Sequence, residues 1–495
     1  MDYEREAREL VQNLSGRLSP SPYDIAWLAR LKTSPKGEAR WPDLMEWLLN
    51  NQYEDGHWGS DVAYYHHQII NTLSAVIALQ KNGRDYRSQS AIKRAENYLW
   101  NHLHFLRRDP FELVGFELLF PTLLKDAQLL GLDVPSHAFG YNEIQSEKLR
   151  LIPPDLLYSP HVATVFSLEF LGASGNAKQL REAVSSNGSL GNSPATTAYY
   201  LSICPDDERA LAYLNSVRQR YSQAANFYPF RTFELTWVLY YLAHCGSPIT
   251  KFVESSIWLE LQSNITASGI SFDPTFCIPD GDTTSVGARL LLEAGYDFNP
   301  VILSKFQDPA TLLFRTWNYE RNTSMGTNMH AFEALNLMPN YPNYSESREA
   351  ILAALLANRV YDLYWVDKWH ASPYYATAHA LMILLKENRY LTQPCLYTVN
   401  WLLHMQRADG SWGFFEEGTA EETAYALLSL LHWHRSHKLP DPDCLHRAAH
   451  YLERMYSEPD TFYPGLYIAK VLFAPYAVVR AAMLSALILY EETFG

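Results

Sequence analysis

The sequence predicts an all-α protein made of paired helices, and three observations support this fold class. Apolar residues recur at intervals of three and four along most of the chain, whereas alternating, strand-like runs are scarce. Clusters of Pro, Gly, Asn and Asp interrupt these segments roughly every 15 to 25 residues, which is typical of a helical repeat or a barrel of paired helices. A short motif also occurs twice, far apart in the chain.

Helical periodicity is strongest in six segments, which we expect to form helices. In chain order these segments cover residues 64–80, 194–202, 231–243, 347–356, 377–386 and 421–434. The repeated motif, Q-x-x-x-G-x-W, lies before the first segment and before the last, with a weaker echo at residues 186–190. Its Gly permits a tight turn, and its Gln and Trp can join one helix to the next, so the motif predicts internal duplication.

Composition narrows the class of protein. The 495 residues suffice for two or three domains, and 47% hydrophobic residues indicate a large globular core. A net charge of −14 argues against nucleic-acid binding. The charged N-terminus lacks a signal-peptide core, no apolar run reaches the ~18 residues of a spanning helix, and the five cysteines show no C-x-x-C spacing. We therefore expect a cytoplasmic protein without a transmembrane segment.

The most informative segment is residues 278–287, where Asp280 and Asp282 follow a proline and precede an apolar, helix-like run. Such acidic pairs usually cap a helix. A carboxylic acid kept protonated in an apolar cavity can also protonate a carbon–carbon double bond. Aromatic residues make up 14% of the chain, and we expect some of them to line a cavity with a cationic occupant, because ring faces attract positive charge.

Further motifs give these carboxylates a context. Residues 19–27 read S-P-S-P-Y-D-I-A-W, residues 115–121 read G-F-E-L-L-F-P, and residues 367–375 read D-K-W-H-A-S-P-Y-Y. Together with Asn-Phe-Tyr-Pro at 226–229 and the acidic motif, they resemble, in family order, the class II diterpene cyclases of the copalyl diphosphate synthase type.

That resemblance implies two α/α barrels in the arrangement called βγ, with the active site between them. The β barrel would comprise residues 1–17 and 251–495 and carry the acid, and the γ barrel would be the inserted residues 18–250. It also implies geranylgeranyl diphosphate as the substrate. No D-D-x-x-D motif for ionising a diphosphate is found, so the diphosphate should be retained. Squalene cyclases share the acid but are substantially longer.

By correspondence with the family motif, Asp282 is the expected general acid and Asp280 part of its hydrogen-bonded network. Thr283 stands where the family usually has a third Asp. The replacement either strengthens the acid, because a negative charge is removed, or supplies a hydrogen bond from the threonine hydroxyl. Ser324 and Asn328, spaced to share one face of a helix, match a hydroxyl and an Asn that hold the acid's carboxyl in the family.

The resemblance also implies the diphosphate site. Lys148, in the K-L-R-L-I-P stretch, and Lys368 are the expected contacts, since an ammonium suits a phosphate as a compact charge. The family's acidic magnesium segment corresponds to residues 107–112, where Asp109 and Glu112 are the candidate Mg²⁺ ligands.

The product depends on what removes the last proton. Relatives that make the unrearranged copalyl skeleton hold a water between a His and an Asn. Asn226 matches the Asn, but the His position is Phe166, which accepts no proton and whose ring stabilises a cation. We therefore expect hydride and methyl shifts to give kolavenyl diphosphate, with a halimadienyl product if they stop halfway. Unrearranged copalyl diphosphate and a drimenyl product from farnesyl diphosphate are the alternatives.

Two other classes of protein compete with this interpretation. A protein prenyltransferase β subunit shares the barrel but needs a zinc site of Asp, Cys and His that the sequence does not suggest. A non-catalytic helical scaffold would be indifferent to the loss of Asp282. A downstream class I terpene synthase, methyltransferase or phosphatase would be the expected partner of a cyclase that retains the diphosphate.

Overall fold

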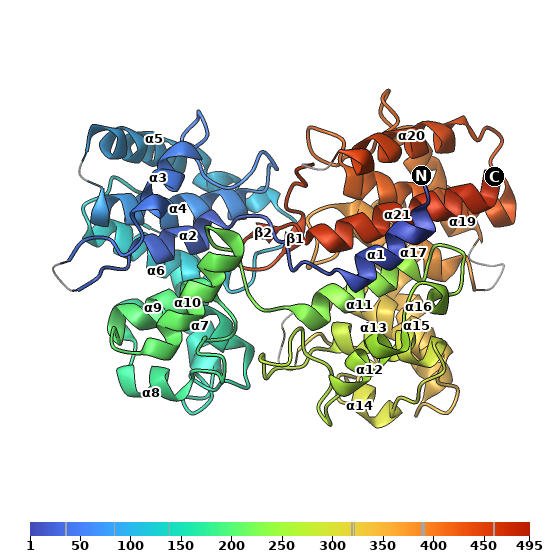
Figure 1. Cartoon of the computed structure of the whole chain (residues 1–495), viewed down its shortest axis with the longest axis horizontal. Helices are drawn as coiled ribbons and strands as arrows, with labels where there is room; N and C mark the ends of the chain where they lie inside the picture. Colours follow the sequence, from blue (N-terminus) through green and yellow to red (C-terminus); the bar gives the residue numbers. More distant parts are fainter. Residues whose placement is uncertain are drawn as a thin grey trace.

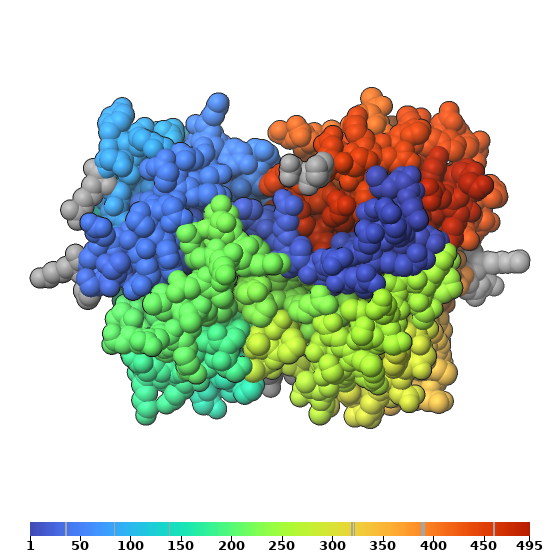
Figure 2. Space-filling model, viewed as in Figure 1, coloured from blue at the N-terminus to red at the C-terminus, as the bar shows by residue number. Residues whose placement is uncertain are grey.

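The computed structural model describes residues 1–34, 37–83, 85–137, 139–317, 320, 322–387, 392–458 and 461–495. Two helical lobes lie side by side, and both chain termini are in the same lobe (Figure 1). The space-filling view shows the N-terminal segment lying across the face of the lobe that also contains the C-terminus (Figure 2). The predicted all-α class is confirmed: the described strands are one short hairpin.

The first lobe is a barrel whose inner ring is almost fully buried. Each inner helix contacts the next and the last contacts the first, which closes the ring. The inner elements are α2 (Pro22–Ala29), α4 (Tyr65–Asn82), α6 (Phe116–Leu129), the 3-10 segment η2 (Ala163–Ser174) and α9 (Pro194–Ile203). The outer elements are α3 (Pro42–Asn50), α5 (Tyr86–His102), η1 (Leu103–Arg108), α7 (Tyr141–Leu151), α8 (Ala177–Glu182) and α10 (Glu208–Tyr221).

The second lobe repeats this plan with six inner helices, again in a closed ring of contacts. They are α11 (Arg231–Leu242), α13 (Gly281–Glu293), α15 (Met325–Asn336), α17 (Pro373–Leu384), α19 (Ala420–His437) and α21 (Tyr476–Phe494). The outer elements are α1 (Tyr3–Gln12), η3 (Ile249–Lys251), α12 (Ser255–Ser263), α14 (Pro300–Ser304), α16 (Tyr344–Ala357), α18 (Thr392–Met405) and α20 (Asp443–Ser457). All six predicted helices are present, with ends shifted by a few residues.

The expected domain boundary at residue 250 needs a correction. Helix α11 lies before it, yet α11 packs against α13 and α21 and its side chains belong to the hydrophobic core of the second lobe. The ring of that barrel cannot close without α11. The core of the first lobe ends near Ala224, while α1 packs on α21 as expected for a first helix that belongs to the second barrel.

The Q-x-x-x-G-x-W repeats perform the same structural task in both barrels. The indole N–H of Trp58 donates to the carbonyl of Leu48 over 2.7 Å, and that of Trp412 donates to the carbonyl of Leu402 over 2.8 Å. A third tryptophan, Trp365, repeats the bond ten residues back along the chain without the full motif. Each bond satisfies a carbonyl near the end of an outer helix, which supports the duplication that the sequence predicts.

A hairpin of β1 (Tyr467–Ile468) and β2 (Leu472–Phe473) links the two lobes (Figure 1). Its turn carries Lys470, whose fully buried ammonium reaches Glu169 of the first barrel over 2.7 Å. No described helix is long and apolar enough to cross a membrane.

Candidate active site

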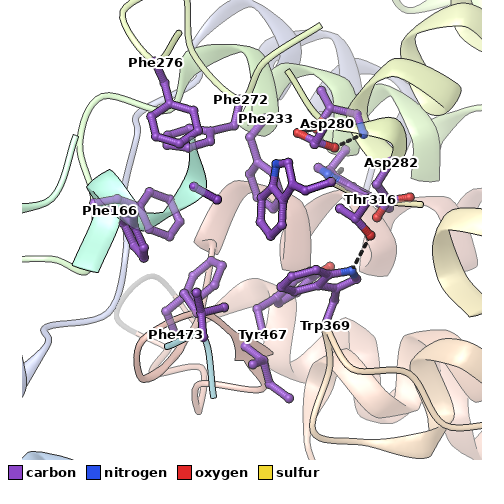
Figure 3. A pocket seen from close by; sticks show the side chains of 18 of the residues that line it. Phe166, Phe233, Phe272, Phe276, Asp280, Asp282, Thr316, Trp369, Tyr467 and Phe473 are labelled. Carbon is purple, nitrogen blue, oxygen red and sulfur yellow. Dashed lines mark hydrogen bonds between the residues drawn. The ribbon is translucent and has the colours of Figure 1, made fainter. Parts of the chain in front are cut away.

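A cavity lies between the barrels, at the N-terminal ends of the inner helices of the second barrel (Figure 3). Its interior volume is about 140 Å³. Aromatic rings form most of its wall, as the composition suggested. These residues are Phe166, Phe227, Phe233, Trp237, Phe272, Phe276, Trp317, Trp369, Tyr375, Tyr467 and Phe473.

Asp280, Asp282 and Thr283 line this cavity on the second-barrel side. Asp280 caps α13: its Oδ1 accepts the backbone N–H of Thr283 over 2.6 Å and its Oδ2 accepts the Thr283 hydroxyl over 2.9 Å. Of the two expectations for Thr283, the structure therefore contains the hydroxyl hydrogen bond, made to Asp280. Burial raises the pKa of Asp280 to about 7 in spite of these bonds.

Asp282, in the first turn of α13, is buried and has a partner that the sequence did not suggest. Nδ1 of His330 on α15 lies 2.6 Å from Oδ1 of Asp282. His330 is itself fully buried, with the rings of Trp237 and Tyr240 each 4.9 Å away. The imidazole therefore fixes the orientation of the carboxyl at the edge of an apolar cavity.

The expectation that Ser324 and Asn328 hold the carboxyl of Asp282 is wrong. Ser324 caps α15 and donates its hydroxyl to Asp367 over 2.8 Å. Asn328 bonds both the N–H and the carbonyl of Phe314 and the carbonyl of Ser324. They do share a face of α15, but His330 lies two residues beyond Asn328, about 200° around the helix, on the face toward Asp282.

Phe166 contributes to the cavity wall from the first barrel, across from Asp282 (Figure 3). The ammonium of Lys470 lies 4.6 Å from the centroid of its ring and donates to its carbonyl over 2.9 Å. Asn226 is not among the lining residues. Its Nδ2 donates to the carbonyl of Val471 over 3.2 Å, and its Oδ1 has no partner among the described atoms.

Both candidate diphosphate lysines are paired with glutamates. Lys148 on α7 is partly exposed and paired with Glu117 of α6. Nζ of Lys368 lies 2.6 Å from Glu320 and 5.0 Å from the ring centroid of Trp369, which lines the cavity. Lys368 is thus adjacent to the cavity.

The candidate metal ligands are joined by hydrogen bonds to other side chains. Oδ2 of Asp109 accepts a hydrogen bond from the backbone N–H of His66 and also lies 2.7 Å from Nδ1 of the same residue. Glu112 accepts a hydrogen bond from the hydroxyl of Tyr141 over 3.1 Å. Nε2 of His66 lies 3.1 Å from the same hydroxyl, which connects the two carboxylates. Among the described residues no group of three or more His, Cys, Asp or Glu could hold a metal ion. Asp109 and Glu112 therefore do not form a protein-only magnesium cage.

Comparisons with known proteins agree with this geometry, although no model of a known protein family matches the sequence. The chain is 31% identical over 507 residues to the Type B diterpene cyclase of Mycobacterium tuberculosis, covering 97% of each chain. It is 28% identical over 519 residues to the (+)-kolavenyl diphosphate synthase of Herpetosiphon aurantiacus, covering 97% of this chain and 95% of that one. The structure of ent-copalyl diphosphate synthase from Streptomyces platensis superposes with a TM-score of 0.82 at 28% identity, covering 99% of this chain and all of the other.

Two barrels of paired helices, with a buried aspartate facing an aromatic cavity between them, define the architecture of a protonation-initiated terpene cyclase. The chain belongs to the class II diterpene cyclases, enzymes that rearrange bonds within one substrate molecule. The predicted family and fold class are thereby confirmed.

Proposed function

We propose that the protein cyclises geranylgeranyl diphosphate to a bicyclic diterpenyl diphosphate, with Asp282 as the general acid. The observation that carries this proposal is the position of Asp282, on an aromatic cavity and held by His330 over 2.6 Å. Relatives named for copalyl and kolavenyl diphosphate support a twenty-carbon substrate with its diphosphate retained.

The carboxyl of Asp282 gives its proton to the terminal double bond of the folded substrate. The resulting tertiary cation is attacked by the next double bond, and that step repeats to close the second ring. Nδ1 of His330 then stabilises the carboxylate that Asp282 becomes. The rings around the cavity exclude water and stabilise positive charge on the carbon skeleton.

We place the diphosphate at Lys368 and Lys148, which would exchange their glutamate partners, Glu320 and Glu117, for phosphate oxygens. Mg²⁺ binds through one or two carboxylates together with substrate phosphates. Any such ion would therefore need the diphosphate for most of its ligands, with Asp109 and Glu112 as the candidate protein ligands.

We propose kolavenyl diphosphate as the product, because Phe166 offers no proton acceptor where the first bicyclic cation would form. The Herpetosiphon relative, named for that product, supports this choice. The contact of Lys470 with the ring of Phe166 reduces that ring's capacity to stabilise a second cation. The lack of a base is therefore the stronger argument. A halimadienyl, copalyl or drimenyl product remains an outcome of the test below.

The retained diphosphate would make the product a substrate for a class I terpene synthase, a methyltransferase or a phosphatase. We also propose that the enzyme works in the cytoplasm, where its charged substrate would be made.

The test is incubation of the purified protein with geranylgeranyl diphosphate and, separately, farnesyl diphosphate, with Mg²⁺ or with EDTA, followed by phosphatase treatment and product analysis by GC–MS and NMR. Asp282→Asn should lower turnover by about 10³-fold or more. The matched control is Asp297→Asn, which changes an exposed aspartate beyond the same helix. A clerodane alcohol supports the proposal. An unrearranged labdane would overturn the product, and equal turnover by Asp282→Asn would overturn the acid.

A further inference from the structure

A chain of hydrogen bonds leads from the proposed acid into the interior of the second barrel. Beyond its contact with Asp282, His330 extends the chain: its Nε2 lies 3.0 Å from Nδ1 of His379. Nε2 of His379 lies 3.2 Å from the hydroxyl of Tyr241. These groups come from four different inner helices, α13, α15, α17 and α11, so the chain crosses the barrel rather than following one helix.

The chain continues to a carboxylate near the far wall of the cavity. The hydroxyl of Tyr241 donates to that of Tyr425 over 3.0 Å, and Tyr425 donates to Oε1 of Glu421 over 2.8 Å. The hydroxyl of Tyr467, a cavity-lining residue, lies 3.1 Å from that of Tyr425. Figure 3 shows Tyr467 on the cavity wall at a distance from Asp282. The two ends of the chain therefore meet the same cavity at separate points.

Burial makes this chain costly as a purely structural feature. His330, His379, Tyr241 and Tyr425 are fully buried, and Glu421 is nearly so. Apolar side chains of similar size could fill the barrel interior, whereas buried polar groups stabilise a fold only when every partner is satisfied. Oε2 of Glu421 has no partner among the described atoms, so one buried carboxylate oxygen is left with capacity to accept a proton.

The chemistry of each member suits proton transfer. A neutral imidazole carries a donor on one nitrogen and an acceptor on the other, and a phenol hydroxyl both donates and accepts. Burial, followed by the neighbouring His330, lowers the pKa of His379 well below its ordinary value, so this ring is neutral and can pass a proton through. Burial likewise raises the pKa of Tyr241 and Tyr425 well above 10, which keeps both hydroxyls protonated.

We propose that this chain is a proton return path: Tyr467 and Glu421 take the proton that ends the cation cascade, and Tyr425, Tyr241, His379 and His330 carry it back to Asp282. This inference rests on the proposed function and deepens it, since it names the terminal base and the route by which the acid is restored.

The step balances without any co-reactant. A C–H bond next to the final cationic carbon breaks, its electron pair forms the new double bond, and its proton goes to the oxygen of Tyr467. Tyr467 releases its own proton to Tyr425, which releases its own to the carboxylate of Glu421. Resetting requires the hydroxyls of Tyr425 and Tyr241 to rotate so that they donate toward His379. The proton on Glu421 then passes by one-bond shifts through these hydroxyls and the two imidazoles to the carboxylate of Asp282. The enzyme thus ends each turnover with the protons that it began with.

Substitutions that interrupt the return path at residues outside the cavity wall distinguish a role in proton transfer from a purely structural role. We would measure the first turnover by rapid quench and later turnovers at steady state, with geranylgeranyl diphosphate and the full chain, for His379→Gln and Tyr241→Phe. The proposed mechanism begins with a proton on Asp282, so each variant should form one product per enzyme at the wild-type rate and then slow by about tenfold or more. The double variant should be no slower than either single variant, because a second interruption of the same linear path adds no further loss of rate.

Tyr374→Phe is the matched control: Tyr374 lies on α17 with His379, is buried, and its hydroxyl has no partner among the described atoms. It should behave as the wild type. Glu421→Gln removes the proton acceptor and should slow the first turnover itself. Equal steady-state rates for wild type, His379→Gln and Tyr241→Phe would overturn the return path, and so would an equal slowing of first and later turnovers. If one variant does not fold, the other decides. Wild-type protein that makes no product would instead overturn the proposed function.

Discussion

Nδ1 of His330 lies 2.6 Å from Oδ1 of Asp282, so the acid motif on α13 is oriented by a histidine on the neighbouring inner helix α15. A carboxylic acid protonates an alkene only when its proton points at the double bond. The contact fixes one oxygen of Asp282, and in the proposed mechanism the other oxygen faces the substrate. Two helices of the barrel thus contribute to the proposed catalytic group.

Replacement of His330 should slow the reaction without abolishing the fold. His330→Ala leaves the carboxyl of Asp282 free to rotate and should lower kcat by about 10²-fold. His330→Asn retains a donor on a shorter side chain and should recover part of that loss. Rates should be measured at saturating substrate, with circular dichroism to verify the helical content. A kcat of His330→Ala within a factor of about two of the wild type would argue against the orienting role.

Phe166→His tests the origin of the rearrangement. An imidazole at this position could accept a proton from the first bicyclic cation, so the product should shift from a rearranged to an unrearranged skeleton. Phe166→Leu provides the control, since it removes the ring but adds no base, and it should keep the rearranged skeleton. NMR of the dephosphorylated products distinguishes the skeletons. An unchanged product from Phe166→His would contradict the assignment of this position.

The buried pair of Lys470 and Glu169 should be essential for the stability of the lobe interface. Both side chains are inaccessible to solvent, and Lys470 also bonds the hydroxyls of Ser193 and Thr196. Lys470→Met or Glu169→Gln alone leaves a buried charge unpaired and should destabilise the protein by about 3–5 kcal/mol. The double variant should be more stable than the less stable single variant. Chemical denaturation measures these differences, and additive losses would show that the pair does not act as a unit.

Asp280 should make stability depend on pH. Burial raises its pKa from 3.8 to about 7, so the folded state holds the proton more tightly than the unfolded chain. The stabilisation is complete below pH 3.8 and is lost as the pH rises through 7, about 4 kcal/mol in total.

Asp280→Asn does not titrate but can still cap α13. Between about pH 5 and 8 its melting temperature should therefore fall less steeply than that of the wild type. Scanning calorimetry at constant ionic strength measures both slopes. Identical slopes would show that Asp280 does not titrate in this range.

The sequence predicted the parts of the site that depend on short stretches of chain. Asp280, Asp282 and Thr283 form one helix start, so their mutual contacts follow from local geometry. The contact of Asp282 with His330 joins residues 48 positions apart. The matched spacing of Ser324 and Asn328 suggested that those residues, rather than His330, hold the carboxyl of Asp282. Spacing indicates which residues share a face of a helix, but not what that face contacts.

The sequence by itself therefore determined the helical class and the family, and it supplied the candidate for the acid, since periodicity and short motifs encode local structure and chemistry. The tertiary structure decided to which barrel α11 belongs and which side chain contacts Asp282. It also decided how Tyr467 is connected to Asp282 by hydrogen bonds between side chains of five inner helices. Those relationships arise when helices distant in sequence close into a ring, and the rotation of each helix in that ring is set by packing of the whole barrel.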